Sequence, residues 1–314
     1  MSTRDDDLLH RASKLQRRIV FPDSSDERTV RAVQELQHLG VAIPILVTHD
    51  TPISEPHLVE YLLERRAGKG LTRSEAEHLA VQPLFRAAWM VHTGEADAGV
   101  AGSVSTTADV LRAGIWTIGM DSSVSVVSSF FLMVLPSGAV LTYADCGVVP
   151  DPTADQLADI AQSSAVSHHI LTGAEPRVAF LSFSTKGSAQ HPHAQKVRDA
   201  FRIFSEKYPN IVADGELQAD AALVPAVAAR KAPSSALAGN SNVLVFPTLD
   251  AGNIAYKLTE RLAGAAAYGP VVQGLQKPFV DVSRGCTWHD MVLTAAIAAL
   301  LSNSAAPGVT PSVP

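Results

Sequence analysis

The segment RIVFPDSSDERTVRAVQELQHLGVAIPILV, residues 18–47, decides the fold class. It opens with a short apolar run, residues 18–22, that predicts a strand. A helix is expected from about Asp26, because four apolar residues fall on one helical face: Val30, Val33, Leu36 and Leu39. Gly40 is typical of a helix C-terminus, and residues 41–47 predict a second strand. The segment therefore predicts a strand–helix–strand unit.

The same alternation of short apolar runs and helical stretches continues along the chain. Later runs predict strands at residues 98–101, 126–135, 140–143, 178–183, 221–224, 243–246 and 279–282. Strands that are apolar throughout suit a sheet that helices cover on both faces. The 314 residues correspond to about two domains. We therefore expect an α/β chain with α/β/α layers.

Composition excludes several classes of protein. With 46% hydrophobic and 18% charged residues, the chain can bury a core and is not a disordered protein. The net charge of -6 and an aromatic content of 6% argue against a nucleic-acid partner, which would favour a basic excess and stacking residues. The longest apolar stretch, near residues 291–301, is too short to span a bilayer. No membrane partner is expected.

The cysteines and histidines point to no metal centre. Two cysteines, Cys146 and Cys286, cannot form a disulfide framework or a four-cysteine zinc site. None of the eleven histidines forms the one-turn helical pair of a zinc-binding H-E-x-x-H motif. The charged first residues do not resemble a signal peptide. These features predict a cytoplasmic protein without a metal.

The richest cluster of candidate chemistry is DVSRGCTWHD, residues 281–290. It lies between a predicted strand and a predicted helix, where α/β proteins bind ligands and where helix N–H groups attract anions. Arg284 offers a planar fork for phosphate, Ser283 a hydroxyl donor and Asp290 a possible base. The alternative is that Asp290 caps the helix and Arg284 is a surface charge.

Two other segments resemble anion-binding turns in their composition. GSVSTTADVLR, residues 102–112, places hydroxyl groups before a helix that carries Arg112, although such hydroxyl groups are more often helix caps. SFSTKGS, residues 182–188, lacks the spacing of a nucleotide-binding phosphate loop. No G-x-G-x-x-G follows the first strand, which argues against a dinucleotide fold.

These motifs together resemble those of the phosphate acetyltransferases (phosphotransacetylases). The signature Ser283-Arg284-Gly285-Cys286 with Asp290 resembles the family most closely, and the resemblance spans roughly residues 10 to 302. Further stretches agree in the same order: Arg66 with residues 70–72, then residues 106–112, 181–189, 251–257, 269–270, 273–275 and 277–278. The chain is similar to the short form of the family.

The resemblance implies an isocitrate-dehydrogenase-like fold. That fold has two α/β/α three-layer domains with a cleft between them, and family members usually form homodimers. The chain would start in domain I (residues 1–126), cross to domain II (127–272) and return to domain I (273–314). The implied reaction moves an acetyl group reversibly between acetyl-CoA and phosphate, giving acetyl phosphate and coenzyme A. It uses no cofactor, since coenzyme A is a substrate.

The resemblance also implies roles for individual residues. Asp290 matches a catalytic base, Ser283 an oxyanion donor and Arg284 a phosphate-binding catalytic residue. The coenzyme A thiolate would attack acetyl phosphate directly in a ternary complex, so Cys286 need not be acylated. Further residues match phosphate- or coenzyme A-binding positions: Arg66, Arg112, Thr106, Thr107, Asn253 and Gln273.

Three other functions are known on folds of this kind. A butyryl- or propionyl-transferring relative shares fold and chemistry, and a methylene is worth only about 1–3 kcal/mol in a pocket. A non-catalytic effector-binding domain would be expected to lack Ser283, Arg284 or Asp290, and all three are present. A hydroxy-acid dehydrogenase on the same fold would need metal-binding aspartates, and no such set can be assembled.

Overall fold

The computed structural model describes residues 3–48, 50–51 and 55–303 and divides into two compact units. The first unit contains the described residues up to Asp121 and those from Leu275 onward, and the second contains Ser122–Gly274. The chain thus leaves the first unit and returns to it. The boundaries expected from the sequence, 126/127 and 272/273, lie close to these transitions.

The first unit is built on a four-stranded parallel sheet. Its strands are β1 (Arg18–Phe21), β2 (Ile43–Leu46), β3 (Ala98–Ala101) and β10 (Phe279–Asp281), in the order β10-β3-β1-β2. Because every strand runs the same way, all carboxyl ends meet at one edge of the sheet. The strands expected at residues 18–22, 41–47, 98–101 and 279–282 are confirmed.

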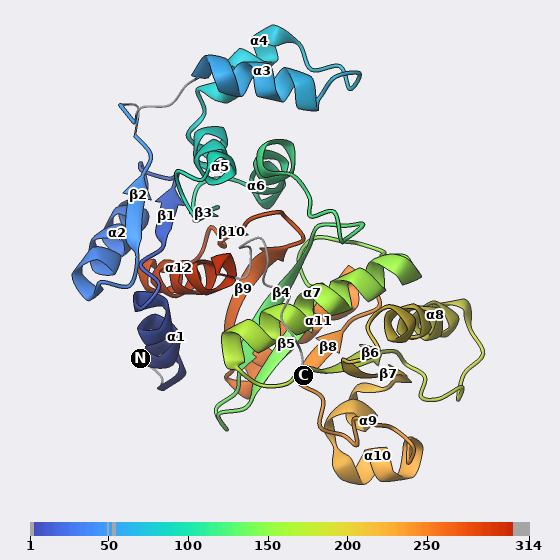
Figure 1. Cartoon of the computed structure of the whole chain (residues 1–314). Coiled ribbons are helices and arrows are strands. Elements are labelled where there is room, and N and C mark those ends of the chain that lie inside the picture. Colours follow the sequence, from blue (N-terminus) through green and yellow to red (C-terminus); the bar gives the residue numbers. More distant parts are fainter. Residues whose placement is uncertain (1–2, 49, 52–54, 304–314) are drawn as a thin grey trace. The chain divides into compact units, whose positions relative to one another are not determined.

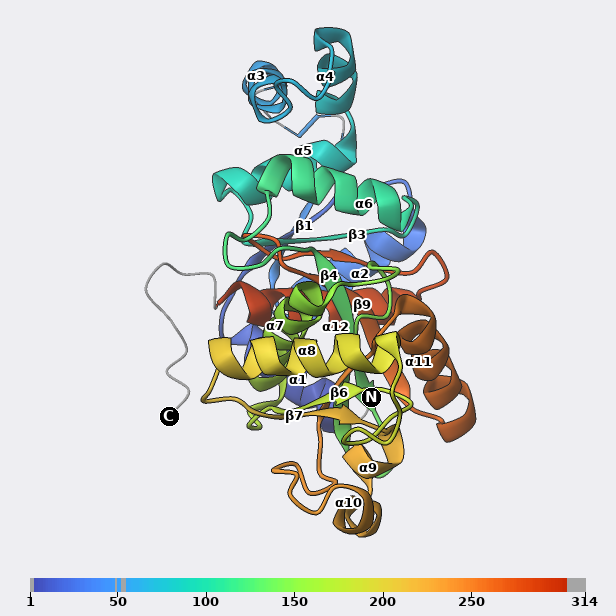
Figure 2. The same cartoon turned by 90° about the vertical axis from the view of Figure 1, so that its right-hand side faces the viewer.

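Helices cover both faces of this sheet (Figures 1 and 2). On one face lie α2 (Glu27–Leu39) and α12 (Trp288–Ser302), and α1 (Thr3–Ser13) packs on α12. On the other lie α5 (Pro83–Thr93) and α6 (Thr107–Ala113), followed by the π-helix η1 (Gly114–Ile118). The pair α3 (Glu55–Arg65) and α4 (Arg73–Ala80) completes the unit. α12 is buried along nearly its whole length, which explains its apolar sequence.

The second unit has a mixed sheet, of order β7-β6-β8-β5-β4-β9. The parallel strands are β5 (Val140–Ala144), β6 (Arg177–Leu181), β7 (Val212–Leu217) and β8 (Val243–Val245). Strand β4 (Ser128–Val134) is antiparallel to β5 and to β9 (Ala266–Gln273). A tight turn, with hydrogen bonds from Leu135 N to Ala139 O (2.9 Å) and Gly138 N to Leu135 O (2.8 Å), joins β4 to β5.

Helices also cover both faces of the second sheet (Figure 1). α7 (Ala154–Thr172) and α8 (Pro192–Lys207) pack on one face, where Phe180 of β6 meets two aromatic rings of α8. α9 (Ala219–Leu223), α10 (Pro225–Lys231) and α11 (Leu249–Ala263) belong to the other side, where Phe131 stacks on Tyr256 at 3.9 Å. Phe180 and Phe131 therefore bury against helices on different faces of the sheet.

One expected strand is wrong. Residues 221–224 lie at the end of helix α9 and just beyond it. Alanine has the highest helix propensity, and Asp220 in the first turn favours the positive end of the helix dipole. An apolar run of four residues does not distinguish a buried strand from a buried helix.

Among the described residues, no helix has the length and hydropathy needed to cross a membrane.

Candidate active site

Three loops follow adjacent strands at the carboxyl edge of the first sheet. They are residues 22–26 between β1 and α2, residues 102–106 between β3 and α6, and residues 282–287 between β10 and α12. Ligands of open α/β sheets bind at this edge. The loops carry Ser283 and Arg284 and lead to Asp290, Thr106 and Thr107.

A buried aspartate ties the first loop to the second. Asp23, which follows β1, is 5% exposed. Its Oδ2 accepts hydrogen bonds from Gly102 N (3.0 Å), Ser103 N (2.9 Å) and Ser103 Oγ (3.0 Å). Two main-chain donors and one hydroxyl are thus satisfied by one carboxylate oxygen, which fixes the start of the β3–α6 loop.

A second buried aspartate ends strand β10. Thr107 Oγ1 donates a hydrogen bond of 2.6 Å to Asp281 Oδ2, while Asp281 Oδ1 is buried without a partner among the described residues. Burial raises the pKa of Asp281 to about 6, the negative charge of Asp23 adds to the rise, and the Thr107 hydroxyl and Arg284 oppose it. Thr107 therefore joins helix α6 to the strand that leads to Ser283.

The loop 282–287 exposes the two side chains expected to meet substrate. Ser283 and Arg284 are exposed, and Ser283 Oγ accepts a hydrogen bond from Gly285 N (3.2 Å). The loop closes on itself through Cys286 N, which donates to Ser283 O at 2.9 Å. Both side chains thus project from a short turn just before the N-terminus of α12, where unpaired N–H groups favour an anion.

Asp290 has the capping role that the sequence offered as its alternative. Its Oδ2 accepts hydrogen bonds from Thr287 N (2.8 Å) and Thr287 Oγ1 (2.9 Å), and Thr287 Oγ1 accepts from Asp290 N (3.2 Å). This reciprocal capping box starts α12 and holds the carboxylate in one orientation. A cap of this kind leaves a base role open, because both contacts use the same oxygen.

Arg66 and Arg112 meet at one aromatic ring. The guanidinium carbon of Arg66 lies 4.2 Å from the ring centre of Trp116, and that of Arg112 lies 5.9 Å from it. Arg112 Nη2 also donates to Asp109 Oδ1 at 2.7 Å. The structure thus brings together two arginines that are far apart in the sequence.

Arg112 also lines two hollows of the first unit. One, of about 530 Å³, is bounded by the loop after β1, residues 22–25, and by Val104, Ser105 and Asp109. The other, of about 580 Å³, lies against α4 and Trp116. Gln82 and Arg112 line both. Their volumes lie in the range of small-molecule sites.

The remaining expected binding residues have structural contacts. Thr106 caps α6, accepting a hydrogen bond from Asp109 N at 3.2 Å. In the second unit, Asn253 Nδ2 donates to Cys146 O (3.1 Å). Gln273 is 7% exposed, and its Nε2 donates to Ser128 Oγ (3.0 Å) and Ser164 Oγ (2.9 Å). A substrate role for these residues stays a prediction.

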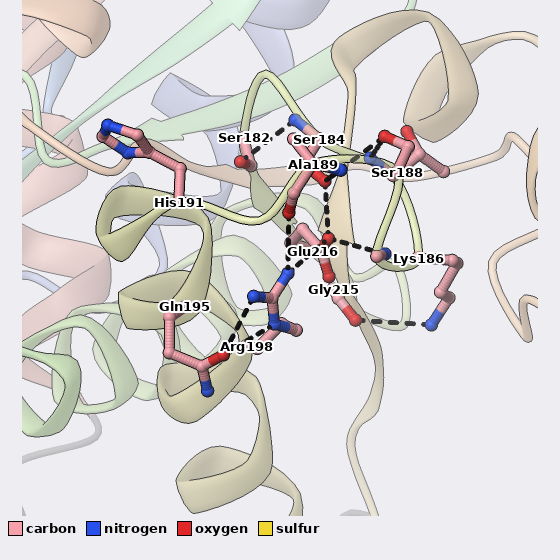
Figure 3. A network of polar contacts seen from close by, with 12 residues as sticks. Ser182, Ser184, Lys186, Ser188, Ala189, His191, Gln195, Arg198, Gly215 and Glu216 are labelled. Atoms are coloured by element: carbon pink, nitrogen blue, oxygen red, sulfur yellow. Dashed lines mark hydrogen bonds and ion pairs between the residues drawn. The ribbon is translucent and has the colours of Figure 1, made fainter.

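The segment of residues 182–188, which resembles a phosphate loop, binds a carboxylate side chain of the protein (Figure 3). Glu216, 1% exposed, accepts hydrogen bonds from Gly187 N (2.8 Å), Ser184 Oγ (2.8 Å) and Arg198 Nη1 (3.0 Å). Burial alone would raise the pKa of Glu216, but these donors hold it below its ordinary value. The loop is therefore filled by a carboxylate, which agrees with the rejection of a nucleotide-binding motif.

No role for Asp23, Arg28 or Trp116 was predicted from the sequence. Asp23 could have been found, because a polar residue directly after a parallel strand is a signal for a site at the sheet edge. The contacts of Arg28 with the other loops and that of Trp116 with Arg66 join residues distant in the chain, which no local spacing marks. No group of three or more metal-ligating side chains is found in the described part of the chain.

Comparison with known proteins places these features in a family. A family model described as "Phosphate acetyl/butaryl transferase" matches residues 5–299. A phosphate acetyltransferase of Acetivibrio thermocellus is 42% identical, with 93% of this chain and 96% of the relative covered. One of Paracoccus denitrificans is also 42% identical, with 94% and 98% covered.

A solved structure agrees with the sequence relatives. The crystal structure of a phosphotransacetylase from Streptococcus pyogenes superposes with a TM-score of 0.91 at 36% identity, covering 97% of this chain and 100% of that one. The fold is the isocitrate-dehydrogenase-like fold expected from the sequence. The chain therefore belongs to the phosphate acetyl/butaryl transferase family of acyltransferases.

Proposed function

We propose that the chain is a phosphate acetyltransferase, which moves an acetyl group reversibly between coenzyme A and inorganic phosphate. The observation that carries the proposal is the loop 282–287 at the carboxyl edge of a parallel sheet. It exposes Ser283 and Arg284 and leads to Asp290 in the first turn of α12. The 42% identity to phosphate acetyltransferases over nearly the whole chain supports acetyl transfer.

The reaction needs a thiolate, and Asp290 is suited to form it. A thiol with a pKa of roughly 8–9 is mostly protonated at neutral pH, so a carboxylate base raises the fraction that can attack. The capping box orients Asp290 at the N-terminus of α12. The proton of coenzyme A would pass to this carboxylate as the sulfur attacks the acetyl carbonyl carbon of acetyl phosphate.

The oxyanion that forms during the reaction and the phosphate that leaves would also have partners in the protein. The Ser283 hydroxyl would donate to the carbonyl oxygen as it becomes an oxyanion. Arg284 would hold the departing phosphate, whose C–O bond to the acetyl group breaks as the C–S bond forms. Arg66 and Arg112, which share the Trp116 ring, would bind further anionic groups of the substrates.

An acyl-transfer assay tests the proposal. Purified protein would be given coenzyme A with acetyl phosphate, and in parallel with butyryl phosphate, and thioester formation would be followed. We expect turnover with acetyl phosphate, at a kcat/KM above that with butyryl phosphate. Faster turnover with butyryl phosphate would identify the butyryl-transferring branch, and turnover with neither would refute acyl transfer.

We also propose a homodimer in the cytoplasm. Three exposed apolar residues lie at i, i+4 and i+8 on α11: Ile254, Leu258 and Leu262. Such a stripe supports self-association through a helix face. Both cysteines are free thiols, which suits a reducing compartment. Light scattering tests the dimer, and Leu258→Glu should yield monomers if α11 forms the contact.

A further inference from the structure

Arg28, in the first turn of α2, contacts two of the three loops at the carboxyl edge and an aspartate of the third. Its Nη1 donates to Arg284 O (2.9 Å) and to Cys286 O (2.7 Å), and its Nη2 donates to Ser103 O (3.2 Å). The first two carbonyls belong to the loop that carries the expected catalytic residues. The third belongs to the β3–α6 loop, which leads to Thr106, Thr107 and Arg112.

Asp26 holds the guanidinium in place. Arg28 Nη2 donates to Asp26 Oδ2 at 2.7 Å, and Arg28 Nε lies 3.1 and 3.2 Å from the two carboxylate oxygens. The side-chain hydrogen bond from Arg28 lowers the pKa of Asp26 below its ordinary value. Asp26 also caps α2 by accepting from Arg28 N (2.9 Å), so the arginine is anchored at both its backbone and its head group.

All donors of the guanidinium are used by the protein. Arginine has five N–H groups, two on each terminal nitrogen and one on Nε. Nη1 serves two carbonyls, Nη2 serves Asp26 and a third carbonyl, and Nε serves Asp26. None is left for a substrate phosphate. Arg28 therefore differs from Arg284, whose guanidinium is exposed to solvent.

We propose that Arg28 is the positioning residue of the active site, which sets the loop carrying Ser283 and Arg284 at a fixed place relative to the β3–α6 loop. This inference rests on the proposed function. Arg284 O and Cys286 O lie on either side of Gly285, and their hydrogen bonds to one nitrogen fix the Arg284–Gly285 and Cys286–Thr287 peptide planes. Those planes determine where the Arg284 side chain and the Gly285 N–H point. A misplacement of about 1 Å can lower a rate by about a hundredfold.

Cys286 offers a readout that does not depend on activity. It is half-buried in the loop, and burial raises the pKa of its thiol to about 11, although the charge of Arg28 lowers it. The chain has two cysteines, and Cys146 is 0% exposed in the second unit. The rate at which a disulfide reagent labels Cys286 thus reports on the loop. Labelling of Cys146 as well reports on general unfolding.

The test compares Arg28→Met and Arg28→Lys with Arg31→Met. Arg31 lies one turn further along α2, and its guanidinium packs 4.2 Å from the ring centre of Trp288. It is a matched control, because it is an arginine of the same helix outside the substrate-binding residues. Steady-state constants and the labelling of Cys286 would be measured on these three variants and on the unaltered protein.

We expect Arg28→Met to lower kcat by about tenfold to a hundredfold while KM for coenzyme A changes by less than about threefold. Labelling should become about tenfold faster at one thiol only. If the pKa of the Cys286 thiol returns from about 11 to its ordinary 9.0, about a hundredfold more of it is thiolate. A thiolate of lower pKa is a weaker nucleophile, which reduces this gain in labelling rate by about tenfold. Loss of the Arg28 charge alone would slow labelling, so a faster rate reports opening of the loop.

Arg28→Lys should be intermediate in both measurements, because an ammonium donates from a single point and cannot span both loops. If Arg28→Met does not fold, the kcat and the labelling rate of Arg28→Lys test the proposal instead. A kcat and a labelling rate equal to those of Arg31→Met would overturn the proposal, as would faster labelling of both thiols together. If the unaltered protein transfers no acetyl group, the proposed function fails, and the labelling comparison still tests whether Arg28 holds the loop.

Discussion

Asp290 caps helix α12, and we propose that the same side chain is also the catalytic base. The capping box needs only an acceptor, which asparagine also provides, whereas a base needs the negative charge. We therefore expect Asp290→Asn to fold normally and to lower kcat by about two to four orders of magnitude. Steady-state kinetics with acetyl phosphate and coenzyme A measure this.

Thr287→Ala is the matched control for Asp290. It removes the hydroxyl that caps α12 and keeps the carboxylate. It should cost about 1 kcal/mol of stability and far less activity than Asp290→Asn. Near-normal turnover of Asp290→Asn would leave Asp290 as a helix cap only.

Asp281 makes stability depend on pH in a predictable direction. Its pKa of about 6 lies above the ordinary value of 3.8, so between about pH 4 and pH 6 the folded state alone retains the proton. The contribution of this group to stability therefore falls as pH rises through that window. Above it the folded protein carries a buried charge, at a cost of about 2–3 kcal/mol.

Asp281→Asn should remove that cost and keep an acceptor for the Thr107 hydroxyl. We expect the variant to be more stable than the unaltered protein at pH 8, with the difference shrinking toward pH 4. Melting temperatures across this range measure it. A difference that does not change with pH would contradict burial as the cause of the raised pKa.

Cys286 has the environment of an unreactive thiol. Its pKa of about 11 keeps it protonated at neutral pH, and direct attack by coenzyme A requires no enzyme nucleophile. Cys286→Ala should therefore keep most of its activity in the same assay. A stable acetyl-enzyme that disappears in this variant would show covalent catalysis instead.

At the level of elements, the β3–α6 loop depends on a single glycine. Gly102 has φ +108°, and a Cβ there would come within 2.0 Å of Asp281 Oδ1 and 2.6 Å of Val282 O. Gly102→Ala should therefore push β10 and its following loop away, lower stability by about 2–4 kcal/mol and abolish most activity. Urea unfolding and the acyl-transfer assay measure the two effects.

Gly40→Ala is the control that separates the two effects expected in Gly102→Ala, the steric clash of the new Cβ and the strain of a positive φ. Gly40 also has a positive φ, of +62°, but nothing lies within 4 Å of a Cβ at that position. It should lose only about 1–2 kcal/mol, the cost of a left-handed conformation. Equal losses in the two variants would mean that the close approach to Asp281 carries no weight.

The elements of the first unit were predictable because local signals and burial agree there. The strand β1, the helix α2 with its Asp26 and Gly40 caps, and the strand β2 follow directly from residues 18–47. The mixed sheet of the second unit was harder to predict from the sequence. Strand β9 contains Gly269 and Pro270, and β7 contains Asp214, Gly215 and Glu216, so neither reads as an apolar run.

The candidate site was predictable only where it follows a strand end. Ser283 and Arg284 come directly after β10, and the parallel sheet places them beside the β3–α6 loop. The contacts that hold these loops, from Asp23, Arg28 and Thr107, join residues 75 to 258 positions apart in the chain. Such pairings depend on the order of strands in the sheet, which no local pattern in the sequence specifies.

For the whole molecule, the arginines should make stability sensitive to anions. Arg66 and Arg112 share the Trp116 ring and should repel each other when no anion is bound. At about ten times its Kd, phosphate or sulfate would add about 1.4 kcal/mol, or about 2 °C in Tm for a chain of this length. Arg66→Gln and Arg112→Gln should reduce that shift, as measured by calorimetry.

Arg202→Gln provides the control for this shift. Arg202 forms an exposed pair with Glu206 in α8 and has no expected contact with substrate. Its loss should leave the phosphate-induced rise in Tm unchanged. An equal loss of the shift in all three variants would point to general charge screening rather than to a site.

Direct transfer in a ternary complex is tested most directly by the initial-velocity pattern of acetyl-CoA formation. Acetyl phosphate would be varied at several fixed concentrations of coenzyme A. Under the proposed mechanism both substrates are bound when the thiolate attacks, so we predict double-reciprocal lines that intersect. Parallel lines would indicate that the acetyl group first passes to the enzyme, and would contradict direct attack assisted by Asp290.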